Sequence, residues 1–129
     1  MKRNEALQPL SWEHHTALKL AKACERAVHS ASAERVSAAC QRVRRAFATE
    51  LEPHFQFEER SLLPLLKGAE MQPLAQRTWS DHQQLRAMLE GLRQNDADAL
   101  DSFGKCLSAH VRFEERELFP ALEKVLPSD

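Results

Sequence analysis

The chain has 129 residues, of which 43% are hydrophobic and 29% are charged, and its formal net charge is −1. This length suffices for a hydrophobic core, and we expect residues 1–129 to form a single domain. The near-neutral charge gives no electrostatic reason to expect nucleic acid or an anionic membrane as a partner. The sequence contains no run of 18 apolar residues, the length needed to span a bilayer, and the N-terminus lacks the apolar stretch of a signal peptide. We therefore expect a cytosolic protein.

Apolar residues recur at helical spacing, and no segment shows the two-residue period of a strand. After a short leader over residues 1–9, four helices are predicted, which span roughly residues 11–30, 33–63, 73–94 and 99–118. Ser11 is a candidate N-cap of the first helix. Pro53 is expected to kink the second helix one turn before itself, and Pro120 to interrupt or end the fourth, with residues 121–129 as a further turn. Short connections between four helices indicate an all-α, up-down-up-down four-helix bundle.

One eleven-residue segment occurs twice, beginning at His54 and again at His110. Both copies read His-x-x-Phe-Glu-Glu-Arg-x-Leu-x-Pro, with seven identities at an offset of 56 residues. In each copy the histidine and the first glutamate are four residues apart, which places them one turn apart on the same helical face. His54 and Glu58 can therefore reach one point in space, and so can His110 and Glu114.

The histidine and glutamate of each copy continue a stripe of apolar residues. In steps of three and four, the stripes run Phe47, Leu51, His54, Glu58 and Phe103, Leu107, His110, Glu114. A carboxylate in such a core position is almost never fully buried unless it is paired or binds a metal. A shared metal site explains both glutamates, and the alternative is that the stripe is misphased and both are solvated. The neighbouring Glu59 and Glu115 lie off the stripe, and we expect them to form a charged, solvated face.

A second, weaker repeat relates the first and third helices. Aligning Trp12 with Trp79 places His15 on His82. The apolar stripe through Leu18, however, favours His14 as the inward-facing residue of the first helix. The alignment is given more weight, so His15 is the first choice and His14 the alternative.

The inward-facing groups form a set of four imidazoles and two carboxylates: His15 (or His14), His54, Glu58, His82, His110 and Glu114. This set is too large for one tetrahedral zinc ion and suits two ions bridged by two carboxylates. Nitrogen and oxygen donors without thiolate favour iron, manganese or zinc. At least one exchangeable position would then be open to a small diatomic ligand or peroxide.

The order His, His-x-x-x-Glu, His, His-x-x-x-Glu, with Phe-Glu-Glu before Leu-x-Pro, resembles the hemerythrin-like (HHE cation-binding) family from about Leu10 to Leu122. The resemblance implies a four-helix bundle that holds two non-haem iron ions with an oxo or hydroxo bridge, manganese or zinc being alternatives. It places the metal ligands at the six positions above.

The chain also departs from the oxygen-carrying hemerythrins. Their third helix has a second histidine where this chain has Arg86, and their last acidic ligand corresponds to Glu115 rather than Glu114. The pattern is closer to the hemerythrin-like domains of iron-sensing F-box proteins and of bacterial di-iron proteins linked to iron–sulfur cluster repair. Arg86 is expected either to attract an anionic ligand over the metal pocket or to extend to the surface.

Three functions follow from this interpretation. The first choice is a di-iron protein that binds or senses O₂, NO, peroxide or iron itself. Redox state or metal occupancy would then alter the stability of the bundle, because metal binding and folding are coupled. The alternative is an enzyme, a di-iron peroxidase or an NO-handling activity. The third is a metal-stabilised bundle that acts as an interaction module. We expect no nucleic-acid or membrane partner.

Overall fold

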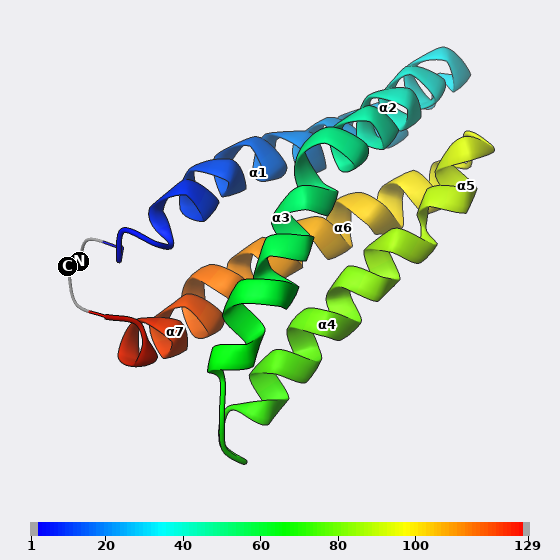
Figure 1. Cartoon of the computed structure of the whole chain (residues 1–129). Helices are drawn as coiled ribbons and strands as arrows, with labels where there is room; N and C mark the ends of the chain where they lie inside the picture. Colours follow the sequence, from blue (N-terminus) through cyan, green and yellow to red (C-terminus); the bar gives the residue numbers. More distant parts are fainter. Residues whose placement is uncertain (1–2, 128–129) are drawn as a thin grey trace.

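The structure is a computed structural model that describes residues 3–127, and these residues form helices and no strand. Four bundle helices run up-down-up-down, as Figure 1 shows. The first is α1 (Gln8–His29), the second runs from α2 (Ala33–Ala46) to η3 (Leu63–Leu65), the third comprises α4 (Gln72–Ala87) and α5 (Leu89–Arg93), and the fourth runs from α6 (Ala97–Phe113) to α7 (Phe119–Val125). The predicted all-α four-helix bundle is confirmed. Over these described residues, no helix is long and apolar enough to cross a membrane.

The first bundle helix begins earlier than predicted, at Gln8, with Pro9 in its first turn, where a missing N–H costs nothing. Ser11 is therefore inside the helix and does not cap it. The predicted leader is wrong for its described part, since Leu7 is fully buried and Arg3 forms an ion pair of 2.7 Å with Glu123 of α7. Residues 1–2 of that leader lie outside the described part of the chain.

The second bundle helix changes its hydrogen-bond pattern at the predicted place. A π-helical segment, η1 (Phe47–Leu51), precedes α3 (Glu52–Phe57), which contains Pro53. Proline cannot donate a backbone hydrogen bond, so the turn before it loses a partner and widens. Figure 1 shows the chain changing direction between α2 and α3, as the expected kink requires.

Two more π-helical segments follow, one in the second bundle helix and one in the fourth. These are η2 (Glu58–Leu62) and η4 (Glu114–Leu118), which begin at the same position of the repeated motif. Pro120 interrupts the fourth bundle helix without ending it, because α7 continues to Val125. The fourth helix begins after Asp96, whose side chain accepts a hydrogen bond from the Asp98 N–H at 2.9 Å.

The hydrophobic core consists of two parts. The larger, the distal core, includes Ala17, Phe55 and Val111, and the smaller, the proximal core, includes Leu10, Leu62 and Leu118. On three bundle helices the chain passes from one part to the other through a buried polar residue: His14 between Leu10 and Ala17, Glu58 between Phe55 and Leu62, and Glu114 between Val111 and Leu118. The fold thus places a polar layer between two apolar ones.

Candidate metal centre

Six polar side chains meet in this buried layer, and every bundle helix contributes to it. They are His14 from α1, His54 from α3, Glu58 from η2, His82 from α4, His110 from α6 and Glu114 from η4. None is more than 7% exposed. Burying so many ionisable groups without compensation would be strongly unfavourable, so their mutual geometry is informative.

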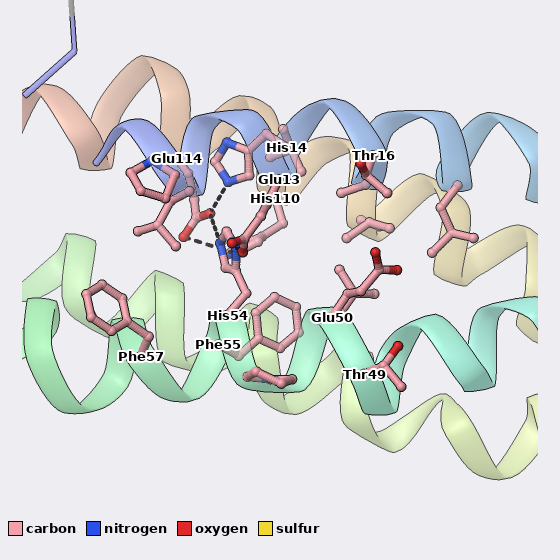
Figure 2. A pocket seen from close by; sticks show the side chains of 18 of the residues that line it. Glu13, His14, Thr16, Thr49, Glu50, His54, Phe55, Phe57, His110 and Glu114 are labelled. Atoms are coloured by element: carbon pink, nitrogen blue, oxygen red, sulfur yellow. Dashed lines mark hydrogen bonds and ion pairs between the residues drawn. The ribbon is translucent and has the colours of Figure 1, made fainter. Parts of the chain in front are cut away.

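The first half of the layer, which we call the His14–His54 half, has two imidazoles directed at two carboxylates. His14 Nε2 lies 2.8 Å from Glu114 Oε1. His54 Nε2 lies 3.2 Å from Glu58 Oε2 and 3.5 Å from Glu114 Oε1. Figure 2 shows His14 and His54 approaching Glu114 from facing helices.

The second half, the His82–His110 half, uses the other oxygen of each glutamate. His82 Nε2 lies 3.0 Å from Glu58 Oε1, and His110 Nε2 lies 3.3 Å from Glu114 Oε2. Each half therefore presents two imidazole nitrogens and one oxygen from each glutamate, within 4.8 Å of one another. This is the donor arrangement that two cations bridged by two carboxylates require.

The inward-facing atoms of the His82–His110 half do not hydrogen-bond one another, whereas in the His14–His54 half His14 Nε2 pairs with Glu114 and His54 Nε2 with Glu58. Among the described residues, Glu58 Oε1, His82 Nε2, His110 Nε2 and Glu114 Oε2 are buried without a hydrogen-bond partner. Buried polar atoms in folded proteins almost always have a partner, and orphaned ones indicate a missing ligand or ion. All four atoms face the point where the carboxylates and imidazoles converge, so the donor set fits metal ions.

Each of the four histidines has a second carboxylate on its outer nitrogen, Nδ1. The Nδ1–oxygen distances are 2.6 Å for His14 with Glu115, 2.8 Å for His54 with Glu13, 2.7 Å for His82 with Glu59, and 2.9 Å for His110 with Asp81. A carboxylate that accepts a hydrogen bond from Nδ1–H favours the neutral tautomer in which Nε2 offers its lone pair inward. All four imidazoles are thus oriented as metal-bound histidines are.

The outer carboxylates are themselves held by other polar groups. Glu115 accepts hydrogen bonds from Ser11 and Arg3, and Glu59 accepts from Arg86 at 2.9 Å. The expectation that Glu59 and Glu115 form a solvated face is wrong, because both lie beside the histidine of another helix. Arg86 neither covers the pocket as an anion site nor extends freely to the surface, since it also binds both carboxylate oxygens of Glu52.

The two inward-facing glutamates each begin a π-helical segment, at Glu58 and at Glu114. In each segment the carbonyl of the glutamate accepts a hydrogen bond from the backbone N–H five residues later. The residue after that donor is a proline, Pro64 in the second bundle helix and Pro120 in the fourth. The carbonyl of Glu115 thereby loses its expected backbone partner, and the guanidinium of Arg3 donates to it instead. The motif prolines were a signal for this altered geometry, which is frequent at functional sites.

The structure brings together every predicted site residue except the first choice on the first helix. His15 is exposed, and His14 occupies the buried position. The choice of His15 is therefore corrected to the alternative, His14. The physical reason is the phase of α1, whose buried stripe runs Leu10, His14, Ala17, Ala21 in steps of three and four.

The pKa values of the two inward-facing glutamates are shifted in opposite directions. Burial raises the pKa of Glu58, and the adjacent Glu114 raises it further. Burial also opposes ionisation of Glu114, but the charge of His110 helps to hold the pKa of Glu114 well below its usual value. Burial lowers the pKa of His110, but Glu114 and Asp81 more than offset this and raise it to about 10. The site thus favours positive charge at its centre, which a bound cation would supply.

Aromatic rings enclose the layer on two sides. The Phe55 ring stacks on His82 with ring centroids 4.0 Å apart, and Phe119 stacks on His14 at 5.2 Å. These contacts restrict the imidazole planes of His82 and His14.

The fold and the site define a helical bundle with a buried cation-binding cluster. The hemerythrin HHE cation-binding domain family matches residues 7–123, which is nearly the whole chain. The chain therefore belongs to this family. No curated protein and no solved structure matches it in the same comparisons.

Proposed function

We propose that the buried layer holds two metal ions, one in each half, with Glu58 and Glu114 bridging them. The observation that carries this proposal is the set of four orphaned inward atoms in the His82–His110 half, together with an outer carboxylate on each of the four histidines. A merely structural polar core would satisfy its inward atoms within the protein.

We propose iron as the metal, with manganese or zinc as alternatives, because the donors are imidazole and carboxylate without thiolate. When bound, iron would supply redox chemistry and an exchangeable position for O₂, NO or peroxide. The residues of the chain would fix the imidazoles and bridge the ions. The function is then the binding or sensing of such a ligand, or of iron itself.

The enzymatic alternative, a di-iron peroxidase or NO-handling enzyme, gains one supporting observation. A cavity lined by His14, His54 and Glu114 opens beside the first half of the centre and offers a path for a substrate. Measured turnover of peroxide or NO by the iron-loaded protein would favour the enzyme over the sensor. An interaction module is favoured only if chelation leaves folding and stability unchanged.

The ligand assignment is tested by comparing His14→Ala with His15→Ala. We expect His14→Ala to lose at least half of the bound metal after anaerobic loading with Fe(II), because one half loses an imidazole. His15→Ala removes a neighbouring exposed histidine and should retain the wild-type metal content. Equal losses in the two variants, measured by mass spectrometry on folded protein, would overturn the assignment.

A further inference from the structure

A cavity of about 520 Å³ lies between α1 on one side and η1 with α3 on the other, and α6 lines its inner end. α1 packs closely on α6 and α2 but has few close backbone approaches to α3. Thr16 on α1 lies across this space from Thr49 on η1, and both side chains are short. Figure 2 shows this space beside the His14–His54 half. Its volume far exceeds the roughly 30 Å³ that a water molecule occupies in the liquid, so a diatomic ligand would leave it nearly empty.

The walls of the cavity are mostly apolar, and its polar groups gather in two places. Leu20, Phe55, Leu107 and Val111 are among the buried wall residues. His14, His54 and Glu114 form one end, next to the metal layer. The exposed Glu13, Thr16, Thr49 and Glu50 form the rim.

The charges at the rim and at the inner end decide what kind of molecule fits. Glu13 and Glu50 at the rim and Glu114 at the inner end place carboxylates around the cavity, and no lysine or arginine lines it. Because Glu13 is paired with His54 and Glu114 with His14, an anion would find no free cationic partner among the described lining residues, whereas the apolar walls favour a molecule with little polarity. Cavities of roughly 300–1,000 Å³ with apolar walls and few polar groups are typical of sites for small organic ligands.

We propose that this cavity binds a neutral, mostly apolar organic molecule of up to three rings, which would contact the imidazoles of His14 and His54. Binding in the cavity depends only on the shape and polarity of the described walls. The adjacency of the molecule to a metal ion, and hence its role as a co-substrate or a sensed ligand, rests on the proposed function.

The test uses the neutral fluorescent probe N-phenyl-1-naphthylamine, titrated into the full-length protein. We expect saturable binding at one site per chain, and much weaker binding of the anionic probe 8-anilinonaphthalene-1-sulfonate. Ala17→Leu places a larger side chain on the cavity wall and should weaken binding of the neutral probe at least tenfold. Lys22→Leu adds the same side chain to an exposed position of α1 outside the cavity and should change nothing.

Equal affinity of Ala17→Leu and Lys22→Leu, or absence of saturable binding to the wild type, would overturn the proposal. If Ala17→Leu does not fold, Thr16→Trp at the exposed rim against Lys22→Trp makes the same comparison. A wild-type dimer in sedimentation that Thr16→Trp dissociates would make the cavity an interface between two copies, and would also overturn it. Metal content is measured on the same samples, so that failure of metal binding with probe binding intact contradicts only the proposed function.

Discussion

At the scale of single residues, the centre is defined by what lies on both nitrogens of each histidine. The inward Nε2 atoms face Glu58 and Glu114, and the outer Nδ1 atoms are held by four further carboxylates. The outer partners matter because they fix the tautomer and ring plane before a metal arrives.

This arrangement predicts the effect of removing one outer carboxylate. Asp81→Ala frees His110 Nδ1 without touching an inward-facing atom, and we expect metal affinity to fall about 10- to 100-fold. Asp101→Ala, which removes a carboxylate paired with the exposed Lys105 on α6, serves as the control and should leave affinity unchanged. Affinities are compared by competition with a chelator of known strength. Equal affinity in both variants would show that the outer carboxylate has no positioning role.

Four of the six inward residues could be predicted from the sequence because helical periodicity and the repeated motif agree on them, and His82 was predicted from the weaker repeat of the first and third helices. The first-helix histidine could not be fixed, since the alignment assumed that Trp12 and Trp79 have equivalent surroundings. Both tryptophans are exposed, at 65% and 50%, and neither sets the phase of its helix through packing. His14 follows Trp12 by two residues, whereas His82 follows Trp79 by three. The outer carboxylates were missed because they come from other helices than their histidines.

At the scale of helical elements, the link between α3 and α4 is electrostatic as well as apolar. Arg86 of α4 donates to both oxygens of Glu52 in α3, at 2.8 Å and 2.7 Å. The same guanidinium reaches Glu59, which holds His82. The ion pair thereby connects the second and third bundle helices beside the metal layer.

The pH dependence of this ion pair can be predicted with its sign. The hydrogen bond from Arg86 lowers the pKa of Glu52 in the folded state. A carboxyl with a lowered folded-state pKa stabilises the protein above its unfolded pKa, and the contribution is lost as the pH falls through the folded value. Glu52→Gln should therefore lower the free energy of unfolding by about 1 kcal/mol at pH 7, and the difference should shrink below about pH 4 until little remains at about pH 2.5. Denaturant unfolding of both proteins at the two pH values measures this, and a difference that persists in acid would contradict it.

The π-helical segments η2 and η4 show what element-level prediction lacked. Periodicity placed Glu58 and Glu114 inward, but the change from four-residue to five-residue hydrogen bonding depends on how Pro64 and Pro120 act together with the tertiary packing. The kink before Pro53 was predictable because proline affects its own helix directly. The start of the first helix was not predictable, because the residues that precede it, Leu7 and Arg3, gain their contacts from α7 and η4.

At the scale of the whole molecule, the bundle encloses a polar layer between two apolar cores and leaves one half of that layer beside a cavity. The four-helix architecture could be predicted from helix count and short connections. The cavity could not be predicted, because it depends on how far α1 and α3 lie apart in space and not on the sequence of either helix alone. The cytosolic location stays a prediction. Because both glutamates span both halves, the two proposed ions should bind interdependently.

The most direct test of this account is metal stoichiometry by mass spectrometry after anaerobic loading with Fe(II), on the wild type and on Glu58→Ala. We predict about two ions per chain in the wild type, since two donor groups share the two glutamates. We predict a loss of both ions in Glu58→Ala, with the helical circular dichroism retained. No bound metal in a folded wild type, or two ions in Glu58→Ala, would contradict the account.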